Sequence, residues 1–165
     1  MMEDTRALTI LIVDDSATDR AIIRGMLGEY NTLTAADGRQ AMDILDGKPG
    51  VDLMILDLNM PVMDGFQVLE AMRGSGRYKD VRTIILTDYE AIDKEIRGLE
   101  LGAVDYIRKP IHMESLRARI RVHTALLAIK HALQRQLSEL KNHPGTDIWP
   151  GSGRYRHFIQ QRPGV

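Results

Sequence analysis

The sequence predicts an α/β fold, a doubly wound, five-stranded parallel sheet followed by a long last helix. Short runs of apolar and β-branched residues alternate five times with segments whose apolar residues recur at helical spacing. Gly, Pro and polar clusters separate these segments. One run, Val51–Asp57, is almost continuously apolar, as expected for a strand buried on both faces of a parallel sheet.

The first two strand and helix pairs follow directly from this pattern. A predicted strand at Leu8–Val13 ends at two adjacent carboxylates, and Ser16 is placed to cap the helix that follows. Asn31–Ala36 is a second, shorter strand, and the helix Arg39–Asp46 comes after it. Gly47–Gly50, which contains a proline, ends that helix.

The central run leads into a third helix, predicted at Asp64–Arg73, and a Gly-rich loop at Gly74–Asp80. Arg82–Thr87 is the fourth predicted strand, and it ends in a hydroxyl residue. Helical spacing of apolar residues then predicts a fourth helix, which Gly102 closes. Val104–Arg108 is the fifth strand.

Composition limits the function classes. The chain is 44% hydrophobic and 27% charged, with a net charge of -1, so no general attraction to nucleic acid or anionic membranes is expected. The absence of cysteine excludes disulfides, thiolate metal sites and cysteine nucleophiles. No apolar run is long enough for a transmembrane helix and the N-terminus is not a signal peptide, so a cytoplasmic location is expected.

Polar residues stand at the ends of four predicted strands. Asp14 and Asp15 follow the first strand, Asp57 ends the third, Thr87 ends the fourth and Lys109 follows the fifth. The carboxyl ends of parallel strands share one edge of the sheet, which is where open α/β sheets bind ligands. These five side chains are therefore expected to form one site.

The chemistry of this set favours a hard divalent cation. Neighbouring carboxylates repel one another, and Mg²⁺ relieves that repulsion with oxygen ligands and water. Zinc is disfavoured because cysteine is absent and the histidines show no ligand spacing. Each histidine is interpreted as a helix-surface or tail residue: His112, His123, His131, His143 and His157.

A metal-bound carboxylate beside a lysine and a threonine suits phosphoryl chemistry. Lys109 and the metal would neutralise the phosphoryl oxygens, and the Thr87 hydroxyl would donate a hydrogen bond to one of them. Asp14 and Asp15 form the metal pair, which leaves Asp57 as the nucleophile that would form an acyl phosphate.

Four ordered motifs over residues 8–125 resemble the receiver domain of two-component response regulators. They are LIVDDS at Leu11–Ser16, DLNMPVMDG at Asp57–Gly65, ILT at Ile85–Thr87 and YIRKP at Tyr106–Pro110. The resemblance implies a flavodoxin-like fold with strand order 2-1-3-4-5. It also implies a phosphorylation-activated switch that catalyses its own phosphoryl transfer and is not a turnover enzyme.

The same resemblance assigns roles to individual residues. Asp57 would take a phosphoryl group from a sensor histidine kinase or phosphotransfer protein. Asp15, Asp57 and the backbone carbonyl of Asn59 would bind Mg²⁺, with Asp14 acting through water. Lys109 would hold the phosphoryl group beside a cis peptide before Pro110.

The implied switch consists of Thr87 and Tyr106. The hydroxyl would move toward the phosphoryl group as the aromatic ring turns inward. Added negative charge biases a bistable element toward one arrangement. The surface of the fourth helix, fifth strand and fifth helix would then change.

One position departs from the family pattern. The residue after the switch threonine is usually small, but here it is Asp88, followed by Tyr89. An extra carboxylate there could slow phosphoryl transfer, which leaves open a degenerate receiver that acts only as a protein-interaction module. A Mg²⁺-dependent phosphohydrolase of the haloacid dehalogenase type is a further alternative, but Asn59 stands where that family needs an acid.

The last helix is predicted to run from Met113 to about Lys141, well past the end of a receiver domain. We divide the chain into a receiver at 1–125, a helical extension at 126–141 and a linker or tail at 142–165.

Apolar residues repeat in a heptad-like manner in the extension: Leu126, Ile129, Leu133, Leu137 and Leu140. This stripe predicts a homodimer through the helix, with packing back on the receiver as the alternative. The basic residues of the helix are interpreted as a solvated face, not a nucleic-acid site.

The tail carries a faint similarity to another family. Asp147–Phe158 resembles the opening motif of diguanylate cyclase (GGDEF) domains at Asp147, Gly151, Arg156 and Phe158. The chain stops before such a catalytic loop could occur. The similarity implies a remnant of an output domain, and the alternative is a disordered tail.

Overall fold

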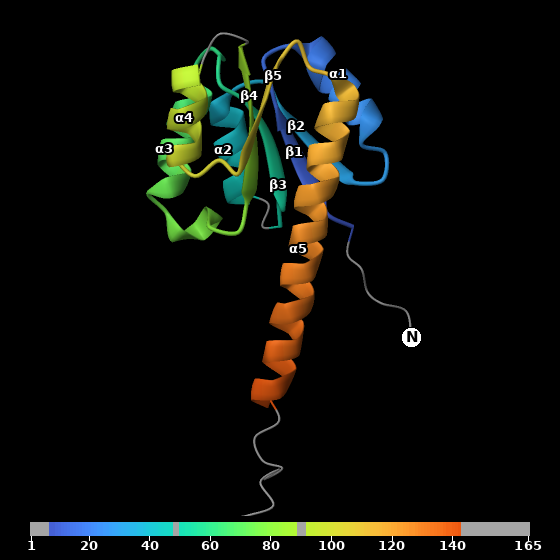
Figure 1. The fold of residues 1–165 in the computed structure, drawn as a ribbon. Helices are drawn as coiled ribbons and strands as arrows, with labels where there is room; N and C mark the ends of the chain where they lie inside the picture. Colours follow the sequence, from blue (N-terminus) through green and yellow to red (C-terminus); the bar gives the residue numbers. More distant parts are fainter. Residues whose placement is uncertain (1–6, 48–49, 89–91, 143–165) are drawn as a thin grey trace, which may run out of the picture. The chain divides into compact units, whose positions relative to one another are not determined.

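A computed structural model of the protein describes residues 7–47, 50–88 and 92–142. The sheet has five parallel strands in the order β2-β1-β3-β4-β5, which confirms both the predicted fold class and the strand order (Figure 1). The strands are β1 (Thr9–Val13), β2 (Asn31–Ala35), β3 (Leu53–Asp57), β4 (Arg82–Asp88) and β5 (Asp105–Lys109).

Helices cover both faces of this sheet. They are α1 (Ala17–Met26), α2 (Gly38–Gly47), α3 (Gly65–Arg73), α4 (Ile92–Glu100) and α5 (Met113–Asn142), with a short 3₁₀ helix η1 at Gly76–Tyr78. The side chains of α1 and the first part of α5 pack on one face, and α2, α3 and α4 lie on the other (Figure 1). The chain divides into two compact units, Met1–Leu127 and Ala128–Val165, so α5 belongs to both.

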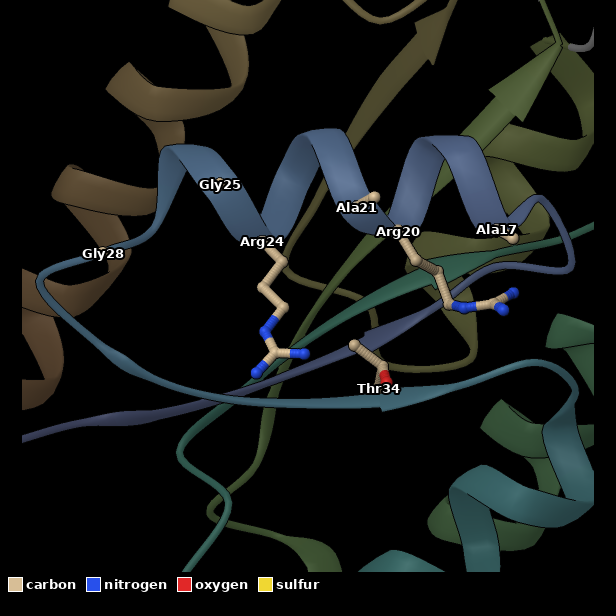
Figure 2. A pocket seen from close by; sticks show the side chains of 7 residues that line it. All are labelled: Ala17, Arg20, Ala21, Arg24, Gly25, Gly28 and Thr34. Carbon is tan, nitrogen blue, oxygen red and sulfur yellow. The ribbon is translucent and has the colours of Figure 1, made fainter.

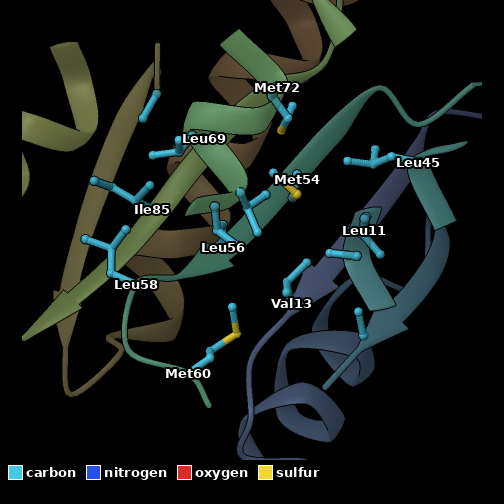
Figure 3. Close-up of a cluster of buried hydrophobic side chains, with 14 of the residues drawn as sticks. Leu11, Val13, Leu45, Met54, Leu56, Leu58, Met60, Leu69, Met72 and Ile85 are labelled. Atoms are coloured by element: carbon cyan, nitrogen blue, oxygen red, sulfur yellow. The ribbon is translucent and has the colours of Figure 1, made fainter. Parts of the chain in front are cut away.

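The central strands are apolar throughout because each supplies a core on both faces. In β3, Met54 and Leu56 point into one core, and Leu53 and Ile55 into the other. Figure 3 shows the first core, where side chains of β1, β3 and β4 pack against those of α2 and α3. This packing fixes where each strand ends, and therefore where its terminal polar residues lie.

Local signals set several helix ends. The Ser16 side chain accepts a hydrogen bond from the Asp19 backbone and caps α1. Asp64 and Gln67 form a reciprocal capping box at the start of α3. Gly102 follows α4 with φ of 109°, a conformation that favours glycine.

Several details differ from the sequence expectations. β4 and β5 each extend one residue further than predicted, to Asp88 and Lys109. The predicted loop at Gly74–Asp80 contains η1. The interpretation of every histidine as a surface or tail residue was wrong for His123, which is buried and contacts Asp105 and Arg82 at 3.1 and 3.0 Å.

In the second unit, α5 continues as helix to Asn142, close to the predicted end. Its apolar residues are exposed: Ile129, Leu133, Leu137 and Leu140. The tail segment that resembles a cyclase motif lies outside the described residues, as do His143 and His157. Over the described residues, no helix combines the length and apolar character that crossing a membrane requires.

Candidate functional site

The site forms at the carboxyl edge of the sheet, where Lys109 brings two carboxylates together. Its ammonium Nζ lies 2.9 Å from Asp14 Oδ2 and 3.1 Å from Asp57 Oδ2. Asp14 follows β1, Asp57 ends β3 and Lys109 ends β5, so residues from three strands meet at one point. Three of the five residues that were predicted to form one site, Asp14, Asp57 and Lys109, thus lie in contact. The peptide bond between Lys109 and Pro110 is cis, also as expected.

Asp14 is fully buried, and the chain around it is held by several contacts. Its Oδ1 accepts a hydrogen bond from the Ser16 backbone at 2.8 Å. Its carbonyl oxygen accepts one from the Arg20 guanidinium at 2.5 Å, and its backbone N–H donates to Ala35 of β2. Both carboxylate oxygens of Asp14 thus have protein donors.

Asp57 is held by the turn that follows it. The Asn59 backbone N–H donates to Asp57 Oδ1 at 3.1 Å, and Lys109 takes the other oxygen. Gly65, at the start of α3, lies so close that a Cβ atom would stand 2.5 Å from the Asp57 carbonyl oxygen. Glycine is therefore required there for α3 to pack against the end of β3.

Burial and charge act in opposite directions on the two central groups. The pKa of Asp57 is raised to about 6 because burial desolvates the carboxylate. The hydrogen bond from the Asn59 N–H and the charge of Lys109 offset only part of this rise. Burial alone would lower the pKa of Lys109, but its hydrogen bond to Asp14 and the charge of Asp57 raise it above its ordinary range. Lys109 therefore stays charged, and Asp57 gains a proton near pH 6.

The carboxylates suit a magnesium ion. One oxygen from each of Asp14, Asp15 and Asp57 lies within 4.8 Å of the other two. Ligand oxygens on opposite sides of one Mg²⁺ are about 4 Å apart, because each Mg²⁺–O bond is about 2.1 Å. Counted formally, three carboxylates and one ammonium carry a charge of about -2, which a divalent cation would cancel. Asp15 is exposed, so its carboxylate is accessible to an ion from solvent.

Thr87 and Tyr106 lie on neighbouring strands but do not contact Asp57 through any described hydrogen bond. The Thr87 hydroxyl is buried and donates to the carbonyl oxygen of Asp88 at 3.2 Å. Tyr106 is partly buried, and the guanidinium of Arg108 lies 5.8 Å from its ring centroid. Arg108 also pairs with buried Glu95 of α4 at 2.6 Å.

Sequence reasoning missed two residues near the cluster. Lys94 of α4 donates to the Asn59 side chain at 3.2 Å, and Asp19 of α1 lies 3.7 Å from the Lys109 ammonium. Neither follows a strand, so the rule that placed the other residues could not find them. The one sequence signal for them is position: each is a charged residue in the first turn of the helix that follows a strand of the site, Asp19 in α1 and Lys94 in α4.

A separate groove of about 550 Å³ lies between α1 and β2. Figure 2 shows Arg24 extending from α1 toward Thr34 of β2, while Arg20 points along the helix toward Ala17. Small residues line the rest of this groove, and no carboxylate does. The Arg20 guanidinium donates to the backbone carbonyl of Asp14 and so links the groove to the acidic cluster.

Comparison with known proteins covers the sheet and its helices. Residues 10–121 match a family described as the response regulator receiver domain. Two-component response regulator ORR5 of Oryza sativa subsp. japonica is 34% identical over 62% of this chain and 78% of its own length. A chemotaxis response regulator of Vibrio cholerae, CheY4, has a similar structure, with TM-score 0.66, 32% identity, and coverage of 72% of this chain and 99% of its own.

Some relatives are much longer than the part that matches. A protein named probable cyclic di-GMP phosphodiesterase, from Vibrio cholerae, is 38% identical over 74% of this chain but only 28% of its own length. The chain therefore spans less than a third of that relative, and the name of the relative describes the whole longer protein.

Proposed function

The chain belongs to the response regulator receiver domain family, and from this premise we propose that Asp57 is its phosphoacceptor. Members of this family are phosphorylation-activated signalling switches. The donor would be a sensor histidine kinase or a phosphotransfer protein. The observation that carries the proposal is the position of Asp57, buried at a strand end and within 3.1 Å of the Lys109 ammonium.

The proposed reaction is a single phosphoryl transfer. A carboxylate oxygen of Asp57 forms a bond to phosphorus as the bond from phosphorus to the donor histidine nitrogen breaks. The bonding electrons stay on the leaving nitrogen, and the donor histidine departs as neutral imidazole because its other ring nitrogen carries a proton. The product is an aspartyl phosphate. Lys109 is placed to neutralise a phosphoryl oxygen, and its raised pKa keeps it charged while it does so. Asp57 needs no general base, because it is mostly ionised above pH 6.

We assign the magnesium ion to Asp15, Asp57 and the carbonyl of Asn59, with Asp14 acting through water. When bound, Mg²⁺ would neutralise charge on the carboxylates and on the transferring group. The closeness of the three carboxylates supports this assignment. So does Asp14, whose two oxygens already accept protein hydrogen bonds.

The proposed switch moves Thr87 and Tyr106. A phosphoryl group at Asp57 would offer the Thr87 hydroxyl a charged acceptor in place of the neutral carbonyl of Asp88. Movement of Thr87 changes the packing beside Tyr106, which lies on the adjacent strand. The surface formed by α4, β5 and α5 would report this change.

We further propose a homodimer through the second unit. Ile129, Leu133, Leu137 and Leu140 of α5 are each more than half exposed. A helix with an exposed apolar stripe gains stability by burying it against a partner. A second copy of the same helix offers a matching stripe.

The alternative function is a protein-interaction module that is not phosphorylated. Asp88 favours it, because a carboxylate next to Thr87 adds negative charge at the entrance of the site. Under this alternative, Asp14, Asp57 and Lys109 would keep only a structural role.

Incubation with Mg²⁺ and acetyl phosphate separates these functions. We expect the intact mass of the wild-type protein to rise by one phosphoryl group only when Mg²⁺ is present. Asp57→Ala should abolish the gain, whereas Asp43→Ala, an exposed change on α2, should retain it. Phosphate release over many turnovers would favour a hydrolase, and the absence of any Asp57-dependent gain would favour the interaction module.

A further inference from the structure

Three polar side chains form a bridge that is joined to Asp57 through Asn59, and we name it the Asp88 bridge. It consists of Asp88 at the end of β4, Asn59 after β3 and Lys94 in the first turn of α4. The Asn59 side-chain amide donates a hydrogen bond to Asp88 Oδ2. Lys94 Nζ donates to Asn59 Oδ1 at 3.2 Å and lies 3.9 Å from Asp88 Oδ2.

Asn59 connects this bridge to the phosphoacceptor. Its backbone N–H donates to Asp57 Oδ1 at 3.1 Å, while its side chain is held by Asp88 and Lys94. The switch residue is connected as well, because the Thr87 hydroxyl donates to the Asp88 carbonyl oxygen. Asp88 thus accepts from Asn59 through its side chain and from Thr87 through its backbone.

The donors that Asp88 holds are those that a phosphoryl group would attract. An amide N–H, an ammonium and a hydroxyl all bind an anionic oxygen, and a phosphoryl group carries about 1.5 to 2 negative charges, more than a carboxylate does. Lys94 has a long, flexible stem and can exchange one anion for another without backbone movement.

We propose that Asp88 is an internal competitor for the phosphoryl group. In the unphosphorylated protein its carboxylate holds the Asn59 amide and the Lys94 ammonium, and a phosphoryl group on Asp57 displaces it. Lys94 then leaves Asp88 and faces the phosphoryl group. Because Lys94 lies in the first turn of α4, this movement transmits phosphorylation to α4. Asp88 is a positioning residue in this scheme, and the scheme rests on the proposed function of Asp57.

The size of the effect is set by exposure. The side chains of Asp88 and Lys94 are 59% and 42% exposed, so water screens their attraction. We therefore expect removal of the Asp88 carboxylate to tighten binding of a phosphoryl analogue by about two- to tenfold.

The first test measures beryllofluoride binding in saturating Mg²⁺ by calorimetry, and Mg²⁺ binding alone. Asp88→Ala and Asp88→Asn should both bind beryllofluoride about two- to tenfold more tightly than wild type. Their affinity for Mg²⁺ alone should stay equal or fall, because a nearby negative charge is lost. Asp93→Ala, an exposed change of equal charge in α4, is the control and should leave beryllofluoride affinity unchanged.

The second test measures whether the contribution of Lys94 to beryllofluoride binding depends on Asp88. Lys94→Ala should weaken beryllofluoride binding more in the Asp88→Ala background than in wild type, because only there is Lys94 already released. Equal effects in both backgrounds would overturn the proposal, as would unchanged or weaker binding in Asp88→Ala or an equal gain in Asp93→Ala. If no protein that retains Asp57 binds beryllofluoride, the proposed function fails and the competitor role fails with it.

Discussion

At Asp57, burial destabilises the ionised form of the carboxyl group. The folded protein holds a proton on Asp57 up to a pKa of about 6, whereas the ordinary value is 3.8. Because the folded state binds this proton more tightly than the unfolded state, protonation of Asp57 adds to the free energy of unfolding. The addition is complete below pH 3.8 and is lost as the pH rises through about 6. The difference between the two pKa values corresponds to about 3 kcal/mol.

A pH-dependent effect of Asp57→Asn follows. In metal-free buffer the substitution should raise the free energy of unfolding by about 2–3 kcal/mol at about pH 8, because the neutral amide avoids a desolvated charge. The gain should nearly vanish at about pH 4, where wild-type Asp57 is protonated. Urea unfolding at both pH values measures it, and an equal gain at both would show that charge burial is not the cause.

Val62 is a second residue with a local cost. It has φ of 69°, it is 81% exposed, and Met63 N–H donates to the Pro61 carbonyl across it at 2.8 Å. This is a γ-turn with positive φ, which is strained for a β-branched side chain. The strain lies in the segment that carries Asn59 and leads to α3.

Val62→Gly should therefore stabilise the protein. Relief of the strained conformation outweighs the greater freedom of glycine in the unfolded chain, and we expect a gain of about 1 kcal/mol in the free energy of unfolding. Val62→Ala retains a Cβ atom and should gain less. Urea or thermal unfolding of the three proteins measures the order, and a loss of stability in Val62→Gly would contradict it.

At the scale of elements, the strands were predictable because a buried parallel strand must be apolar on both faces. Val51–Asp57 and Leu8–Val13 therefore marked the sheet, and the rule of strand ends placed Asp14, Asp57 and Lys109 together. What the pattern could not supply were contacts between side chains on different elements.

The buried network around His123 and the Asp88 bridge are two such cases. His123 lies on α5, but its partners Asp105 and Arg82 begin β5 and β4. Lys94 meets Asn59 across 35 positions of sequence. The local pattern of α5 does not distinguish His123 from residues on a solvated face, and in α4 the local signal for Lys94 is only its place in the first turn.

The extended part of α5 makes its own prediction. Leu133→Glu with Leu137→Glu should raise the dissociation constant of the proposed dimer at least about tenfold, because each buried leucine is worth about 1.5–3 kcal/mol. Gln134→Glu with Ser138→Glu adds the same charges one position along the helix and should have a smaller effect. Sedimentation of the full chain measures the constants. A wild-type monomer at every concentration, or equal effects of both pairs, would contradict the proposed interface.

At the scale of the whole molecule, the described residues form a receiver unit and a helical unit, and only the first contains the acidic cluster. The match covers 78% of a two-component response regulator and only 28% of a longer protein that is named probable cyclic di-GMP phosphodiesterase. The proposed change at the surface of α4 and β5 is compatible with either arrangement. The central claim for both is the same: Asp57 reversibly carries a phosphoryl group.

The most direct test of that claim locates the modified residue. The protein is incubated with Mg²⁺ and acetyl phosphate, reduced with borohydride, which converts an aspartyl phosphate to homoserine, and digested for peptide mass analysis. We predict homoserine at position 57 and at no other position, and none when Mg²⁺ is replaced by a chelator. Reduction at Asp14 or Asp15, or incorporation of phosphate with Asp57 intact, would contradict the account.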